Sequence, residues 1–189
     1  MVGMSLKSML SFAIVASVTT LSFAQTDKCR LSPVTYECST HPVLVVNFDK
    51  VNLSKCGSFY DKSLFLKLKD VAYTSADATK NYTVAMIDPD APRHEKGQAY
   101  LHWLRTGVQG SDLVNRVLTT GHTVTDYAPP TPPNGTGVHR YLFYLYQETE
   151  NTNATVESIT KRGKFDLDEY AKQHALCGPI AVNMFSTQY

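Results

Sequence analysis

Five short runs of apolar residues, six to ten residues long, constrain the fold of this chain more than any other feature. They are rich in β-branched and aromatic side chains, and segments with proline, glycine and charged residues separate them, which is typical of strands. The third run ends at an Asp-Pro step, where proline cannot donate a ladder hydrogen bond. We therefore predict a β-rich single domain with strands over residues 43–48, 64–71, 82–88, 99–108 and 139–148.

Helical patterns are few. Residues 113–118 form one short candidate helix, and residues 166–176 form another, which begins with acidic residues and ends at Cys-Gly-Pro. Residues 126–137 form a loop rich in proline and glycine, and its length favours a functional role.

Residues 1–24 have the pattern of a secretory signal peptide. Lys7 precedes an apolar run, and small residues at Ser22 and Ala24 favour cleavage after Ala24. A retained membrane anchor is the weaker alternative, because the run is shorter than the roughly 20 residues that span a bilayer. We expect a secreted, extracellular protein with one domain over residues 25–189. Cleavage removes one lysine and changes the formal net charge from +1 to 0, so nucleic acid is not an expected partner.

An even number of cysteines remains in a chain that is expected to enter an oxidising compartment. Two disulfides are predicted, with buried free thiols as the alternative, and the sequence leaves all three pairings open. No Cys-x-x-Cys spacing is present, which argues against a zinc site made of these thiols. The four candidates are Cys29, Cys38, Cys56 and Cys177.

Aspartate, histidine and tyrosine residues that could bind a ligand lie in or next to the predicted strands. Asp88 and Asp90 follow the third run, His102 lies within the fourth, and His139 and Tyr141 open the fifth. Such side chains can converge on one cleft, although an ordinary Asp-Pro turn and a core tyrosine would give the same pattern. In a cleft, histidine and tyrosine can donate hydrogen bonds to an anion while a carboxylate orients the histidine.

Catalysis finds little support in the sequence. No Gly-x-Ser-x-Gly elbow occurs, and cysteines in disulfides cannot act as nucleophiles. His102, His139 and Asp88 are an alternative set of metal ligands, but nothing in their spacing is specific to a metal. We therefore expect a protein that is not an enzyme, with no metal and no cofactor, and we interpret His94 in the charged turn "RHEK" as a solvated surface residue.

Three motifs, "DPDAP" (88–92), "LHWL" (101–104) and "PPNGTGVHRYLFYLYQ" (132–147), closely resemble the phosphatidylethanolamine-binding protein family. The resemblance extends over nearly all of the chain from Pro42 onward. It implies a mainly β fold, an antiparallel β-sandwich with a few short helices, and a small pocket for phosphate-like anions and phospholipid head groups.

The resemblance also assigns the pocket residues. The chain has "APPTPP" where the family has glycines, and Thr131 is the only residue of 129–133 with a backbone N–H, so we predict that this N–H meets the phosphate. The predicted ligand-binding residues are Asp88, Asp90, His102, Trp103, Thr131, Pro133, His139 and Tyr141.

Four Asn-x-Ser/Thr sequons are present. Asn134 lies in the proline-rich loop, where a glycan would crowd the pocket, so we expect this sequon to be unused. The better candidates for glycosylation are Asn52, Asn81 and Asn153.

The leading hypothesis is a secreted protein whose pocket binds a phosphate-bearing anion or a phospholipid head group such as phosphatidylethanolamine. The alternative is an extracellular protease inhibitor or signalling protein that acts through its surface. Peripheral contact with a membrane and an extracellular protein target are open as further partners, and a monomer is expected.

Overall fold

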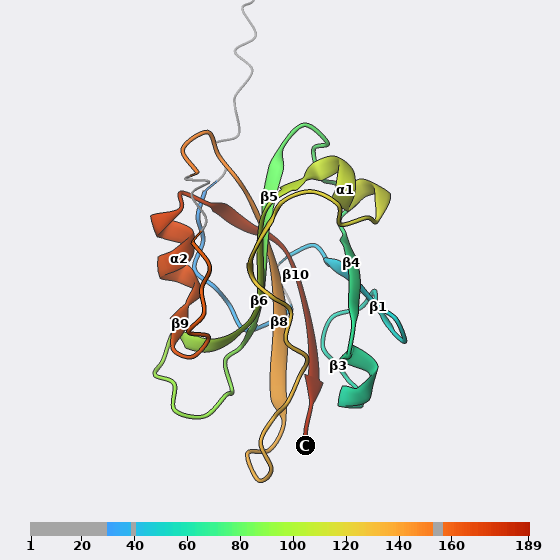
Figure 1. Cartoon of the computed structure of the whole chain (residues 1–189), viewed down its shortest axis with the longest axis vertical. Helices are drawn as coiled ribbons and strands as arrows, with labels where there is room; N and C mark the ends of the chain where they lie inside the picture. The colour runs from blue at the N-terminus through green and yellow to red at the C-terminus, as the bar shows by residue number, and fades with distance from the viewer. Residues whose placement is uncertain (1–29, 39–40, 153–156) are drawn as a thin grey trace, which may run out of the picture.

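The computed structural model describes residues 30–38, 41–152 and 157–189. Two β-sheets and two short α-helices form the fold (Figure 1). The elements, in chain order, are β1 (Val45–Phe48), β2 (Asn52–Leu53), β3 (Ser58–Phe59), the 3-10 helix η1 (Lys62–Phe65), β4 (Leu68–Ala72), β5 (Asn81–Asp88), β6 (Gln98–Gln109), α1 (Gly110–Asn115), β7 (His122–Thr125), β8 (His139–Gln147), β9 (Phe165–Asp166), α2 (Leu167–Gln173) and β10 (Cys177–Thr187).

The smaller sheet has the strand order β2-β1-β4, and the larger sheet has the order β3-β10-β8-β5-β6-β7, with β9 paired to β6. The named strands pair antiparallel, except that β3 runs parallel to β10. Figure 1 shows the smaller sheet on one side of the larger sheet and α2 on the other. The prediction of a mainly β, antiparallel sandwich with a few short helices is therefore confirmed.

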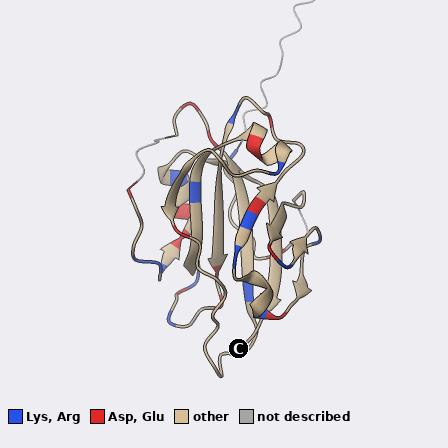
Figure 2. Cartoon of the chain, turned by 45° about the vertical axis from the view of Figure 1, so that its right-hand side comes forward, with Lys and Arg blue, Asp and Glu red and all other residues tan. Residues whose placement is uncertain are grey.

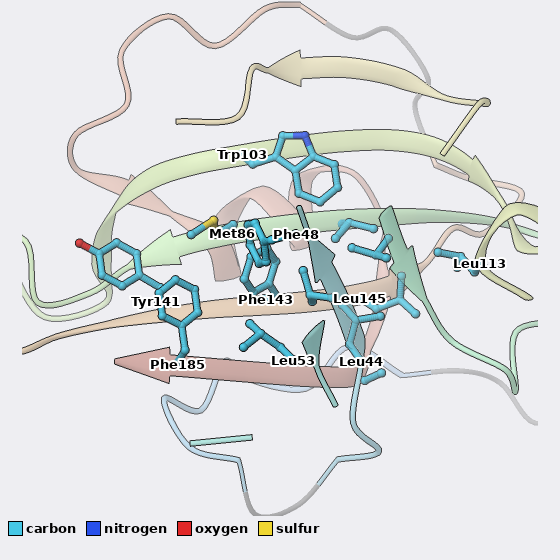
Figure 3. Packing of buried hydrophobic residues seen from close by; sticks show 14 of the residues in the cluster. Leu44, Phe48, Leu53, Met86, Trp103, Leu113, Tyr141, Phe143, Leu145 and Phe185 are labelled. Carbon is cyan, nitrogen blue, oxygen red and sulfur yellow. The ribbon is translucent and has the colours of Figure 1, made fainter. Parts of the chain in front are cut away.

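The main core fills the space between the two sheets. Phe48 from the smaller sheet packs with Phe143 and Phe185 from the larger sheet, at ring-centroid distances of 6.2 and 6.5 Å. Figure 3 shows this cluster, with Tyr141 at one end of it. Residues two apart on a strand point to the same face. Side chains at the ends of β5 and β8 can therefore lie on the face that forms the core.

The opposite face of the larger sheet is covered by α2 and by residues 30–38. Leu167 and Tyr170 of α2 join a second buried cluster on this face. The Tyr144 hydroxyl donates to the Thr35 carbonyl at 2.9 Å, and the Val34 N–H donates to Asp168 Oδ1 at 2.8 Å. Both faces of the sheet are thus buried, which explains why its strands are apolar along nearly their full length.

Four of the five predicted strands occur, and the prediction for residues 64–71 is partly wrong. Residues Lys62–Phe65 form a 3-10 helix, because the Asp61 side chain accepts the Ser63 N–H at 2.8 Å and caps this turn. Strand β4 begins only at Leu68. The predicted helix 113–118 occurs earlier, as α1, and the predicted helix 166–176 occurs as α2.

Cys38 and Cys56 form a disulfide across 18 residues of sequence, and Cys177 is also disulfide-bonded. No described cysteine is a free thiol. Cys29 and the predicted signal peptide lie outside the described residues.

No helix within the described ranges is long and apolar enough to span a bilayer. In Figure 2, acidic and basic residues are interspersed along the ribbon, in agreement with the small formal net charge of +1.

Candidate functional site

A cavity of about 520 Å³ lies at the end of the larger sheet where β5 ends and β8 begins. The loops that follow β5 and precede β8 lie at this end, in the lower part of Figure 1. The volume falls in the range of small-molecule sites, roughly 300–1,000 Å³. Six of the eight predicted ligand-binding residues line the cavity: Asp88, His102, Thr131, Pro133, His139 and Tyr141.

Asp88 and His139 form a buried pair in the cavity wall. His139 Nδ1 lies 2.7 Å from Asp88 Oδ2, and the other carboxylate oxygen accepts the Asp90 N–H at 2.8 Å. His139 Nε2 lies 2.8 Å from Thr136 Oγ1, whose hydroxyl proton is directed to the Pro133 carbonyl at 2.7 Å. Both ring nitrogens of His139 are thus engaged, Nδ1 by the Asp88 carboxylate and Nε2 by the Thr136 hydroxyl. His139 therefore has no ring nitrogen free for a ligand.

His102 sits on a β-bulge in β6. Met86 of β5 pairs with Trp103 and Ile87 pairs with Leu101, so His102 is the extra residue and is turned towards the cavity. Its Nδ1 donates to the Ala128 carbonyl at 2.8 Å, which leaves Nε2 without a partner among the described residues. Burial lowers the pKa of His102 below its usual value, and the Ala128 hydrogen bond and the Asp88 charge oppose this only in part. The apo state thus favours a neutral ring with an Nε2 lone pair.

The Tyr141 hydroxyl is the unsatisfied polar group of the site. Tyr141 is fully buried, its ring packs 5.1 Å from that of His102, and its oxygen has no hydrogen-bond partner among the described residues. Figure 3 shows this hydroxyl at the outer end of the core, pointing away from the other labelled side chains. Burial raises the pKa of Tyr141, and the Asp88 carboxylate raises it further through its charge and its approach to the hydroxyl, although the two groups do not reach hydrogen-bond geometry. The group therefore remains a hydrogen-bond donor.

Thr131 and Pro133 bring the proline-rich loop to the cavity. Both are exposed on the cavity wall, and the Thr131 N–H has no hydrogen-bond partner among the described residues. The Thr131 N–H, the single backbone donor of residues 129–133, is therefore available to a ligand. Its contact with an anion stays a prediction.

Two predicted ligand-binding residues do not line the cavity. Asp90 faces Arg140 instead: its carboxylate accepts Nε at 2.8 Å and Nη2 at 2.7 Å, so its charge is already paired. Trp103 lies in the core between the sheets, 3% exposed, because the bulge at His102 places it opposite Met86. The structure therefore does not bring these two side chains to the cavity, and their contact with a ligand stays a prediction.

Five cavity residues were not predicted, and three of them have polar side chains: Arg93, His94 and Tyr100. Arg93 has a left-handed backbone (φ 67°), a conformation that costs about 1 kcal/mol for a residue with a Cβ. His94 is half-buried, and its Nδ1 lies 2.7 Å from the Ala91 carbonyl, so it is only partly solvated. Tyr100 was predictable, because it lies two residues before His102 in the same strand.

Among the described residues, no three His, Cys, Asp or Glu side chains are grouped so that they could hold a metal ion. Of the glycosylation candidates, Asn52 and Asn81 are exposed, and Asn153 lies outside the described residues. Asn134 is also exposed, so the expectation that it is unused stays a prediction.

The fold and the site define a class: a β-sandwich protein with a cavity lined by histidine and tyrosine at one end of its larger sheet. Residues 49–185 match the family model described as Phosphatidylethanolamine-binding protein. The chain belongs to this family.

Individual relatives agree with this assignment. A candidate odorant-binding protein of Drosophila melanogaster, named A5, is 30% identical over 122 residues, which cover 61% of this chain and 56% of the relative. The chain thus spans little more than half the length of that relative. The solution structure of CG7054 is similar with a TM-score of 0.59 and 26% identity, over 81% of this chain and 88% of that one. A phosphatidylethanolamine-binding protein from Plasmodium vivax shares the fold, with a TM-score of 0.61 and 21% identity over 79% of this chain and 87% of that one.

Proposed function

We propose that this protein is a secreted binding protein, not an enzyme, whose cavity holds a phosphate-bearing anion, most simply the phosphodiester of a phospholipid head group such as phosphatidylethanolamine. The observation that carries the proposal is the Tyr141 hydroxyl, which is buried at the cavity without a partner. An unpaired buried hydroxyl costs about 1–3 kcal/mol, and a ligand oxygen would offset this cost.

Two further donors support an anion rather than a neutral ligand. The Thr131 N–H has no partner among the described residues, and His102 Nε2 becomes a donor when the ring is protonated. Arg93 adds a fixed positive charge to the cavity wall. The Asp88 carboxylate, which would otherwise repel an anion, is engaged by His139 Nδ1 and by the Asp90 N–H.

Secretion is supported by the signal-peptide pattern and by the disulfides. The Drosophila melanogaster relative is named as an odorant-binding protein, which agrees with a role in binding small molecules.

The test is calorimetric titration of the secreted protein with glycerophosphoethanolamine, a soluble phosphodiester head group. Tyr141→Phe removes the unpaired hydroxyl and should weaken binding roughly tenfold, because a hydrogen bond to a charged oxygen contributes about 1.5–3 kcal/mol. Tyr146→Phe is the matched control, since the Tyr146 hydroxyl is also buried without a described partner but does not line the cavity. It should leave the affinity unchanged.

Inorganic phosphate and vesicles containing phosphatidylethanolamine are the other two ligands to compare. Binding to both the head group and the vesicles supports recognition of a lipid, whereas binding to phosphate alone limits the function to small anions. A wild-type protein that binds none of the three ligands would contradict the proposal. The alternative of an extracellular inhibitor or signalling protein that acts through its surface would then be preferred.

A further inference from the structure

A second cavity, of about 280 Å³, lies at the opposite end of the larger sheet. Its lining includes Asn81, the first residue of β5, whereas the lining of the first cavity includes Asp88, the last residue of β5. The two ends of this strand are roughly 23 Å apart at about 3.3 Å per residue. The cavities share no lining residue, so the second is a separate site.

Glu148 gives this cavity a fixed carboxylate. Its Oε1 accepts the Thr83 hydroxyl and the Gly107 N–H, each at 2.7 Å, and these bonds hold the side chain in place. Its Oε2 has no partner among the described residues. Among the described residues, no Lys or Arg lines the cavity, and the lining histidines, His122 and His174, add positive charge only when they are protonated. The cavity is therefore suited to a cation.

Thr106 is an independent sign of a ligand. It lines the cavity, it is only 8% exposed, and its Oγ1 has no hydrogen-bond partner among the described residues. The neighbouring Thr120 shows the usual state of such a group: its hydroxyl donates to Asp112 and accepts the Gln109 N–H, both at 2.9 Å. A buried hydroxyl that the protein leaves unpaired can accept a hydrogen bond from a bound molecule.

Tyr170 and His174 supply an aromatic wall. Their ring centroids lie 4.2 Å apart, and both residues line the cavity. Aromatic rings attract ammonium groups through their negative faces. A carboxylate, an unpaired hydroxyl and an aromatic wall in one small cavity are together the features that recognise a protonated amine.

We propose that the second cavity binds a small organic cation, a protonated primary amine, with Glu148 Oε2 and Thr106 Oγ1 as acceptors of its N–H groups. The volume, close to the lower limit for ligand pockets, restricts the ligand to a short amine. This site is independent of anion binding at the first cavity.

The experiment is an NMR titration of the ¹⁵N-labelled protein without N-glycans, because a glycan on Asn81 would lie at this cavity. The probes are n-propylammonium chloride and its neutral analogue 1-propanol. The ammonium should shift the Gly107 and Gly121 amides saturably, because the Gly107 N–H is bonded to Glu148 and Gly121 lines the cavity. 1-Propanol should leave both amides unchanged. Equal shifts with the two probes, or no shift with either, would overturn the proposal.

Two variants assign the contacts. Glu148→Gln should weaken the ammonium titration at Gly121 tenfold or more, as expected for loss of a charged hydrogen bond. Thr106→Val removes only the unpaired hydroxyl, so it should keep or raise the melting temperature while weakening the ammonium several-fold. Asp49→Asn removes a carboxylate that lines neither cavity, so it is the control and should leave the ammonium titration unchanged. Unchanged ammonium affinity in folded Thr106→Val and Glu148→Gln proteins would also refute the site.

Discussion

His139 Nδ1 lies 2.7 Å from Asp88 Oδ2, and the two side chains are 0% and 4% exposed. The contact joins the end of β5 to the start of β8 in the wall of the candidate anion site. A buried charge that loses its partner is strongly destabilising, even where an apolar replacement of both partners would be neutral. The pair therefore holds the cavity wall and sets its charge at the same time.

Asp88→Asn should lower the free energy of unfolding by about 2 kcal/mol, because it replaces the buried carboxylate that accepts hydrogen bonds from His139 Nδ1 and the Asp90 N–H. Denaturant unfolding followed by tryptophan fluorescence measures the change. Asp49→Asn is the matched control, since its contact with Lys67 is long, 3.9 Å, and both side chains are largely exposed. The control should change stability by less than about 1 kcal/mol. Equal effects of the two substitutions would show that the buried contact contributes no more to stability than the exposed one.

Much of the fold was predictable because the strands follow local rules. The runs at residues 82–88, 99–108 and 139–148 are apolar on both faces, and they form β5, β6 and β8 with bounds that differ by one residue at most. Strand β10 was not predicted. It begins with Cys-Gly-Pro and carries Asn183 in its centre, a residue that disfavours strands. Asn183 is tolerated because its amide donates to the Leu44 and Leu53 carbonyls at 2.6 and 2.8 Å, and these partners are more than 100 residues away in sequence.

The candidate site was likewise predictable from the sequence only in part. Resemblance to a family placed His102 and His139 in one cavity, but no sequence pattern indicates that a bulge isolates His102 from the pairing of β6 with β5. That bulge separates His102, in the cavity, from Trp103, in the core. Likewise, whether Asp90 meets a ligand or Arg140 depends on the packing of two loops, which residue types alone do not determine.

Thr131→Pro should abolish binding of glycerophosphoethanolamine, and Thr131→Ala should largely preserve it. Proline removes the single backbone N–H of residues 129–133, whereas alanine keeps it. Calorimetric titration of both variants measures the difference. Thr131 is exposed and its hydroxyl has no described hydrogen bond, so neither change should disturb the core. Equal affinities of the two variants would exclude the backbone contact.

Replacement of Cys38 and Cys56 together by serine should lower the free energy of unfolding by about 3 kcal/mol, the amount expected from loop-closure entropy for a loop of this length. Thermal unfolding of the variant and the wild-type protein, both without a reducing agent, measures the loss of stability. The loop lies away from the cavity, so the affinity for glycerophosphoethanolamine should stay the same. A large loss of affinity in the folded variant would indicate that the bridge supports the site.

Protonation of His102 should control both stability and anion binding. Burial lowers its pKa in the folded protein below the unfolded value of about 6.5. Above that pH the ring is neutral in both states and contributes nothing. As the pH falls through about 6.5, the unfolded chain takes up the proton first, so the stability of the free protein decreases until the folded pKa is reached. His102→Gln should remove this part of the pH dependence.

The affinity for an anion should have the opposite pH dependence to stability and increase as the pH falls. A neutral His102 presents an Nε2 lone pair to the ligand, whereas the protonated ring donates from Nε2 and keeps its Nδ1 bond to Ala128. The affinity for glycerophosphoethanolamine, whose phosphodiester does not titrate between pH 5 and 8, should therefore rise as the pH falls and be lost as the pH rises through the bound-state pKa. Asp88, His94 and His139 also line this cavity, so the His102→Gln variant must be titrated in parallel. A wild-type affinity that is flat from pH 5 to 8 would exclude a cationic His102 in the complex. A pH dependence that is unchanged in His102→Gln would show that one of the other three groups causes it.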